Sequence, residues 1–273
     1  MFLLGSAYPT AKLGLNESIP PILFGSMRMG IVFLCLLPFV KLKLPNKKYL
    51  LPLIGFGISM GAGVNLFLYL SISTSNILAP IVIGAQLSIP IAIIFSSLFI
   101  GESVSLNKWI LIITSFLGIV LIGFDPKIAD EILGFLLICC MAFFYASSQV
   151  FSRYLKELDV KFNSAFMGLV GFIILLVLSI FFEGNTIQHL KNLNMKAWLL
   201  ALHHGILCSL LGHMSMFYLY RFYPVGQVLP FYALFPVFGM LLSFFIFGEI
   251  PTLIMVIGGI IVISSVFLLQ KVR

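Results

Sequence analysis

Long apolar runs separated by short polar breaks extend through the whole chain, and they restrict its fold more than any other feature. A membrane-spanning helix needs about 20 mostly apolar residues. Breaks at proline, asparagine, glycine and charged residues divide the 273 residues into ten such segments. Their approximate limits are 1–15, 20–40, 50–72, 77–100, 108–124, 131–154, 162–182, 196–220, 225–247 and 252–270. We therefore expect an all-α integral membrane protein with ten transmembrane helices.

The composition excludes a water-soluble fold. The chain is 61% hydrophobic and 9% charged, whereas ordinary domains are about 45–50% apolar and about 25% charged. Soluble enzymes, nucleic-acid-binding proteins and secreted disulfide scaffolds are thereby excluded, and all four cysteines lie inside apolar runs. The first segment, 1–15, is short for a span, and a few residues missing upstream of Met1 would account for this.

The distribution of lysine and arginine predicts the orientation, because basic loops stay on the cytoplasmic side. With the N-terminus in the cytoplasm, the outer loops carry three basic residues, Lys127, Lys191 and Lys196. The cytoplasmic side then carries eleven, namely Lys41, Lys43, Lys47, Lys48, Lys108, Arg153, Lys156, Lys161, Arg221, Lys271 and Arg273. We expect both termini to be cytoplasmic and the protein to lie in the cell (inner or plasma) membrane as a multi-pass protein.

Two stretches of the sequence resemble each other. In each, a proline is followed by an apolar run and a Gly-Glu pair, with 12 residues from Pro90 to Glu102 and 13 from Pro236 to Glu249. One last apolar span follows each pair, so 1–124 and 131–270 have the pattern of two copies of a five-span unit. An odd number of spans inverts the second copy. Inverted repeats are typical of secondary transporters, whose substrate site lies near the midplane between the halves.

At these residues the chain resembles the EamA family of the drug/metabolite transporter superfamily over essentially its whole length. The resemblance is carried by Gly5-Ser6 with Lys12, by Pro20 with Arg28, and by the two Pro…Gly-Glu units. It implies ten helices arranged as five plus five and outward movement of metabolites. Ala85-Gln86 and the stretch 220–249 are most similar to bacterial exporters of cysteine and O-acetylserine. The chain departs from the family at Leu4-Gly5, where relatives have a tryptophan before the glycine.

Polar residues at corresponding depths of the two halves predict a cavity. A polar side chain in the membrane is costly and should face the interior. Gln86 and Tyr232 each lie four residues before a proline, and Asn65 and His213 lie at the middle of spans three and eight. Tyr8 and Lys12 in span one have the spacing of Tyr145 and Gln149 in span six. We expect spans 1, 3, 4, 6, 8 and 9 to line the cavity and its substrate-binding residues to be Lys12, Arg28, Asn65, Gln86, Tyr145, Gln149, His213 and Tyr232.

Each of these residues also has a structural interpretation. Lys12 could extend to the headgroups, and Asn65 and Gln149 could join helices by hydrogen bonds. Arg28 lies roughly 12 Å into span two at about 1.5 Å per residue; it could attract a carboxylate together with Lys12, or bind a structural partner. Pro90 and Pro236 kink helices and serve either as hinges of a gate or as static bends.

Coupling and the competing function classes depend on the titratable residues. The nine carboxylates lie in loops or at span ends, so we expect uncoupled or exchange transport, with His213 as proton carrier in the alternative. A membrane enzyme would need a metal site built from His203, His204, Cys208 and His213. A flippase or drug transporter of the same superfamily, and a non-transporting subunit, are further alternatives.

The sequence thus predicts a secondary transporter, not an enzyme, that exports an amino acid or a similar amphipathic metabolite by alternating access. Its expected partners are that small molecule and the lipid bilayer, with no nucleic acid, no metal and no cofactor. A homodimer and the identity of the substrate are left open.

Overall fold

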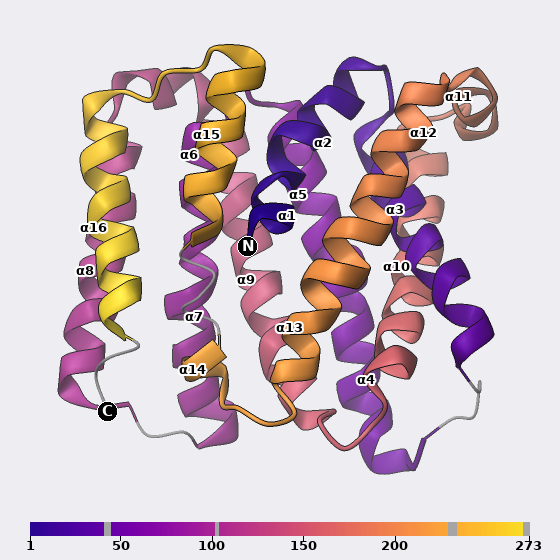
Figure 1. The fold of residues 1–273 in the computed structure, drawn as a ribbon, viewed down its shortest axis with the longest axis horizontal. Helices are drawn as coiled ribbons and strands as arrows, with labels where there is room; N and C mark the ends of the chain where they lie inside the picture. Colours follow the sequence, from indigo (N-terminus) through magenta and orange to yellow (C-terminus); the bar gives the residue numbers. More distant parts are fainter. Residues whose placement is uncertain (41–44, 102–103, 229–233, 270–273) are drawn as a thin grey trace.

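The computed structural model describes residues 1–40, 45–101, 104–228 and 234–269, and all regular structure within these ranges is helical. The helices run side by side in one bundle, with α8 and α16 at one edge and α3, α10 and α12 toward the other (Figure 1). The N-terminus lies at mid-height of the bundle (Figure 1).

In the first half of the chain, several α-helices continue into short segments of 3-10 helix or π-helix. Its α-helices are α1 (Phe2–Gly5), α2 (Ala7–Asn16), α3 (Pro21–Leu36), α4 (Leu50–Phe56), α5 (Val64–Ser73), α6 (Ala79–Gly84), α7 (Ser88–Phe95) and α8 (Leu106–Gly123). Tighter turns are η1 (Leu37–Phe39), η2 (Lys47–Tyr49) and η4 (Ala85–Leu87), and wider π-helical segments are η3 (Gly57–Gly63) and η5 (Ser96–Ile100).

The second half begins with the turn η6 (Pro126–Glu131) and contains one long π-helical segment, η7 (His203–His213). Its α-helices are α9 (Ile132–Tyr154), α10 (Val160–Phe182), α11 (Thr186–Asn192), α12 (Met195–Leu202), α13 (Met214–Leu219), α14 (Val225–Val228), α15 (Phe235–Phe247) and α16 (Leu253–Leu269). A π-helical segment thus lies within predicted span three and another within predicted span eight.

Seven helical segments of the described residues are long and apolar enough to cross a membrane. They are Pro21–Phe39, Lys47–Ser73, Ala79–Ile100, Leu106–Gly123, Ile132–Tyr154, Val160–Phe182 and Met195–Leu219. The other three predicted spans are shorter in the described residues, because the helix changes direction at Ser6 and because α15 and α16 have 13 and 17 residues. The seven segments establish a multi-pass membrane protein, while the count of ten helices and the side of the termini stay predictions.

The most extensive helix pairs that join the first half of the chain to the second are α3 with α10 and α8 with α16 (Figure 1). Both pairs run antiparallel and approach at glycines. An ideal Cβ on Gly168 of α10 would lie 2.9 Å from the backbone nitrogen of Phe33, and one on Gly118 of α8 would lie 3.0 Å from the carbonyl of Gly258. Such small-residue contacts are the usual way for membrane helices to pack closely.

The repeated Gly-Glu pair has a conformational reason at its glycines. Gly101 and Gly248 both adopt left-handed backbone, with φ of 79° and 68°, and each ends a helix. A Cβ at either position would have open space around it, so it is the positive φ that favours glycine there.

The two ends of the bundle differ in charge. One end, called here the basic end, holds the starts of α4, α8 and α10 and the end of α9, with Lys48, Lys108, Lys161 and Arg153. The opposite end, called here the acidic end, carries Glu17, Asp125, Glu131, Glu183 and Glu249, which bind backbone N–H groups or side chains of other segments.

Glu183 shows what these carboxylates do. Its two oxygens accept the backbone N–H groups of Ile22 at 2.6 Å and Leu23 at 2.9 Å, at the first turn of α3. Those N–H groups have no acceptor within the helix, and the helix dipole favours a negative charge at this position. The carboxylate therefore fixes the start of α3 to the end of α10.

We expect Glu183→Gln to lower the free energy of unfolding by about 1–2 kcal/mol, because one oxygen acceptor becomes an amide donor facing an N–H group. Thermal unfolding of the purified protein in detergent measures this. Glu157→Gln is the matched control, because Glu157 pairs with an exposed Lys48 at the basic end and its loss should hardly move the curve. Equal curves for wild type and Glu183→Gln would contradict the capping role.

Candidate functional site

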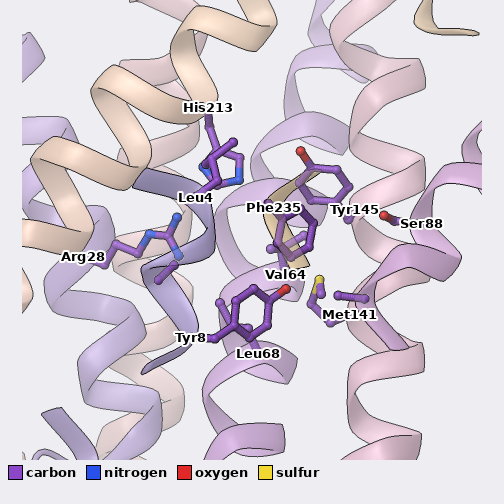
Figure 2. A pocket seen from close by; sticks show the side chains of 12 residues that line it. Leu4, Tyr8, Arg28, Val64, Leu68, Ser88, Met141, Tyr145, His213 and Phe235 are labelled. Carbon is purple, nitrogen blue, oxygen red and sulfur yellow. The ribbon is translucent and has the colours of Figure 1, made fainter. Parts of the chain in front are cut away.

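A small cavity lies within the bundle, where segments of both halves meet (Figure 2). It offers about 40 Å³ to the centre of a water molecule, and one buried water needs about 10–15 Å³ on this measure. The cavity therefore holds a few waters and is too small for a metabolite. Its lining is mostly apolar and consists of Leu4, Ala7, Tyr8, Arg28, Val64, Leu68, Ala85, Ser88, Met141, Tyr145, His213 and Phe235.

Aromatic rings form much of the wall. Tyr8 of α2 stacks on Phe235 of α15, with ring centroids 5.6 Å apart and planes 3° apart. Tyr145 of α9 meets His213 of η7 edge to face at 5.9 Å. Figure 2 shows these four rings around the same space. Flat amphipathic surfaces of this kind bind the apolar part of a ligand while leaving a polar edge for orientation.

Arg28 is the one charged residue among those that line the cavity. It is 1% exposed, and its Nε donates to the hydroxyl of Ser209 in η7 at 2.8 Å. The guanidinium group points from α3 toward the cavity (Figure 2). No carboxylate of the described residues lies within ion-pair distance of it. The predicted structural partner of Arg28 is therefore a neutral hydroxyl.

A hydrogen-bonded histidine cluster lies beside Arg28. His204 is fully buried, with its Nδ1 2.8 Å from the hydroxyl of Tyr69 and its Nε2 3.0 Å from the hydroxyl of Thr10. His203 Nε2 lies 3.2 Å from the hydroxyl of Ser6. Within the described residues, no three His, Cys, Asp or Glu side chains converge as metal ligands. The cluster therefore joins η7 to α1, α2 and α5 by hydrogen bonds.

The π-helical segments η3 and η7 are each supported by a side chain that reaches back four or five residues. The amide of Asn65 donates to the carbonyls of Met60 and Gly61, at 3.0 and 2.9 Å. In η7, Nδ1 of His213 lies 3.0 Å from the carbonyl of Cys208. In a π-helix each backbone hydrogen bond joins residues five apart instead of four, and such segments are frequent at functional sites. Asn65 thus supports η3 and is not among the cavity residues, whereas His213 both supports η7 and lines the cavity.

Lys12 lies at the acidic end and not at the cavity. Its ammonium nitrogen is 3.0 Å from Oε1 of Glu249, and it also donates to the carbonyl of Asn76. Oε2 of Glu249 accepts the N–H of Leu78 at 2.8 Å. The pair is largely buried, with side-chain exposures of 15% and 12%. Lys12 therefore binds a carboxylate of the other half rather than the headgroups.

The two predicted glutamines are buried but outside the lining. Gln86 lies in η4, fully buried, and the cavity is lined by its neighbours Ala85 and Ser88. Gln149 donates to the carbonyl of Tyr145 at 3.3 Å and to the hydroxyl of Ser148 at 3.1 Å.

The prolines and Tyr232 complete the predicted set. Pro90 lies in the first turn of α7, which directly follows the tight turn η4, and Pro236 lies in the first turn of α15. Pro90 has no N–H to donate to the carbonyl of Gln86, which fits the change of pitch there. Tyr232 lies outside the described residues.

Nine lining residues were not in the predicted binding set, namely Leu4, Ala7, Tyr8, Val64, Leu68, Ala85, Ser88, Met141 and Phe235. Tyr8 carried a signal, its pairing with Tyr145 in the repeat. Met141 lies one helical turn before Tyr145, and Phe235 directly precedes Pro236. An apolar residue in an apolar span has no signal of its own, so only its spacing from a polar residue could have indicated it.

The chain is similar to known proteins over nearly its whole length. The sequence profile of the EamA-like transporter family matches residues 1–124 and 132–270. A protein of Bacillus subtilis (strain 168) named "Uncharacterized transporter YdfC" is 26% identical over 281 aligned residues, covering 97% of this chain and 86% of that protein. A solved structure described as "Crystal structure of protein" superimposes with a TM-score of 0.65 at 19% identity, covering 99% of this chain and 97% of that one. This last likeness concerns the fold alone.

Proposed function

The chain belongs to the EamA-like transporter family, and from this premise we propose that it exports small amphipathic metabolites, such as amino acids or their derivatives, as a secondary transporter. The family match confirms the resemblance drawn from the Gly-Glu units. Together with the transporter relative it favours a membrane transporter over an enzyme.

The observation that carries the proposal is the central cavity bounded by both halves. Its two tyrosines, Tyr8 and Tyr145, come from segments that correspond in the proposed repeat, α2 and α9. Further parts of its wall come from two more corresponding pairs, α5 with η7 and α7 with α15. The close pairs α3 with α10 and α8 with α16 also join corresponding, antiparallel spans. These relations support two inverted five-helix repeats, 1–124 and 131–270, around a midplane site.

The proposed mechanism is alternating access. Because the cavity holds only a few waters, a metabolite enters only when the halves move apart. Pro90 and Pro236 are the proposed hinges, and the ion pair of Lys12 with Glu249 closes the acidic end. Tyr8, Tyr145, His213 and Phe235 are placed to contact the substrate, with Tyr232 as a further proposed contact.

The remaining predicted residues have indirect roles in this proposal. Asn65, Gln86 and Gln149 hold the backbone or the packing behind the cavity wall. The basic end faces the cytoplasm by the positive-inside rule, and the acidic end faces outward across the cell membrane. Since the N-terminus lies at mid-height of the bundle, the cytoplasmic location of both termini stays a prediction. Two copies could form a homodimer.

Counterflow in proteoliposomes tests the proposal. We expect saturable exchange of one class of amphipathic metabolite, with a rate at least about tenfold lower in His213→Ala, since an edge-to-face ring pair at the cavity is lost. His189→Ala is the matched control, because it changes the same residue type in α11 at the acidic end and should exchange at the wild-type rate.

The same assay separates the alternatives. A rate equal at about pH 6 and about pH 8 would remove His213 as proton carrier and support exchange. Absence of exchange with every small metabolite, from protein shown to be folded, would overturn the proposal in favour of lipophilic drugs or lipid-linked substrates. The mostly apolar lining of the cavity is the observation that favours this second candidate function, transport of lipophilic drugs or lipid-linked substrates.

A further inference from the structure

The charge of the central cavity is unbalanced. Arg28 lies inside the candidate membrane span Pro21–Phe39, is 1% exposed, and brings a positive charge into the bundle. It donates to the neutral hydroxyl of Ser209, and the neutral hydroxyl of Tyr69 also interacts with it. A buried charge without a counter-ion is costly, and in membrane helices such residues usually pair or mark a substrate path.

The other groups that face Arg28 do not neutralise it. The titratable side chains close enough to interact electrostatically with Arg28 are Tyr69, His203, His204, Cys208 and His213. None of them is a carboxylate. His204 is held between two hydroxyls, and His213 is held against a backbone carbonyl. The surroundings of Arg28 are therefore polar but bring no negative charge of their own.

The described part of the chain brings no acidic residue to the cavity either. Among the described residues that line it there is no Asp or Glu, and residues 229–233, which the structure does not describe, contain none in the sequence. Lys12, which the sequence suggested could attract a carboxylate together with Arg28, instead forms an ion pair with Glu249 at the acidic end. The cavity thus has one positive charge and nothing negative to receive an ammonium group.

We propose that the central cavity selects amphipathic monocarboxylate anions that lack an ammonium group, with Arg28 as the group that binds the carboxylate. This inference rests on the proposed transport function and narrows its substrates from amphipathic metabolites in general, amino acids included, to these anions. An anion makes the site neutral as it binds. A zwitterionic amino acid also pairs its carboxylate with Arg28, but its ammonium is then buried without a carboxylate partner, with aromatic faces as its only strong attraction.

The preference for anions over zwitterions and neutral compounds, called here the charge rule, is tested on the wild-type protein with matched probes. Leucine, 4-methyl-2-oxopentanoate and the methyl ester of the latter share one carbon skeleton and carry a zwitterion, an anion and no charge. Counterflow in proteoliposomes is expected to be at least about tenfold faster for the oxo acid than for leucine or the ester. Thermal stabilisation of the detergent-solubilised protein by each compound is measured in parallel.

Variants then assign the effect to Arg28. Arg28→Gln is expected to lose the preference for the oxo acid, and Arg28→Lys to keep part of it, because lysine retains the charge but lacks the two-pronged donor geometry. Arg221→Gln is the control, since Arg221 is exposed near the basic end. If Arg28→Gln does not fold, the three-probe comparison in wild type still decides.

The outcomes separate this inference from the proposed function. Exchange of leucine at a rate equal to or above that of the oxo acid overturns the charge rule and leaves the transporter intact. An oxo-acid preference that persists in folded Arg28→Gln overturns the assignment to Arg28. Absence of both exchange and thermal stabilisation with all three probes overturns the anion site alone, whereas the proposed transport function is overturned only if folded protein exchanges no small metabolite at all.

Discussion

Replacing Glu249 by glutamine is expected to loosen the acidic end of the bundle and to slow transport at least about tenfold. The carboxylate of Glu249 binds Lys12 of α2 at 3.0 Å and the N–H of Leu78 at the start of α6 at 2.8 Å. It therefore ties the end of predicted span nine to spans one and four. A glutamine keeps at most one of these contacts and leaves the ammonium of Lys12 largely buried beside a neutral group.

The magnitude follows from the burial of the pair. Removing one partner of a fully buried ion pair costs about 3–5 kcal/mol, and the 15% and 12% exposures reduce this to about 2 kcal/mol. Each 1.4 kcal/mol is about a factor of ten in an equilibrium constant. The form with a closed acidic end should accordingly lose more than tenfold in population relative to an open one.

Cysteine accessibility measures that shift directly. Ala7, which lines the cavity, is replaced by cysteine in a background whose native cysteines are serine. A membrane-impermeant thiol reagent added at the outer face is expected to react about tenfold faster when Glu249→Gln is also present. Counterflow measured on the same variants shows the accompanying loss of rate.

Two controls make this result specific. Glu17→Gln also removes a carboxylate that binds a lysine at the acidic end, but the Lys196 partner is 59% exposed, so transport should be unchanged. The exchanged pair Lys12→Glu with Glu249→Lys should restore part of the rate, since the ion pair re-forms while the acceptor for Leu78 is lost. Wild-type labelling and transport in Glu249→Gln would contradict a closing role for this contact.

Glu17 itself is held differently. Hydrogen bonds from Lys196 and Asn194 lower the pKa of its carboxyl group, so the pair stays charged at neutral pH. Because it is exposed, salt screens it, in contrast to Lys12 with Glu249.

The features that could be predicted from the sequence are those set by single segments. The apolar runs, the repeated Pro…Gly-Glu unit and the deep position of Arg28 all follow from residue order, and Arg28 does line the cavity. The partner of Lys12 did not follow, because Glu249 lies 237 residues away along the chain. Only the packing of span one against span nine brings them together.

The predicted facing of side chains fails where the helix changes pitch. Gln86 and Pro90 share a face of a regular α-helix, but the tight turn η4 (Ala85–Leu87) advances the chain differently, and Ala85 and Ser88 face the cavity. The π-helical η3 adds about one residue per turn before Asn65, which rotates the following residues. In a span that is apolar on all sides, no periodicity reveals such a change.

The largest effect on folding is expected at Gly61 and Gly171, where η3 and α10 meet backbone to backbone. An ideal Cβ on Gly61 would lie 2.4 Å from the carbonyl oxygen of Met167, and one on Gly171 would lie 2.5 Å from that of Gly61. Real Cβ atoms do not come so close, and a backbone carbonyl cannot rotate aside as a side chain can. Any side chain at either position must push the two segments apart.

Gly61→Ala is therefore expected to lower the free energy of unfolding by about 3 kcal/mol, the upper part of the range for overpacking, despite the higher helix propensity of alanine. At this chain length that corresponds to a melting temperature about 6–12 °C lower, measured by thermal unfolding in detergent. Gly61→Leu should not yield folded protein, since the leucine side chain would require a separation that also breaks the contacts of Gly171.

Gly123→Ala is the matched control, because a Cβ there has nothing within 4 Å and alanine should be neutral or slightly stabilising. A melting temperature of Gly61→Ala within about 2 °C of wild type would contradict the close contact. The contact also bears on transport, because η3 leads directly into Val64 and Leu68 of the cavity wall. Folded Gly171→Ala should consequently show slower counterflow as well as a lower melting temperature, whereas Glu183→Gln, whose contact lies at the acidic end, should lower the melting temperature alone.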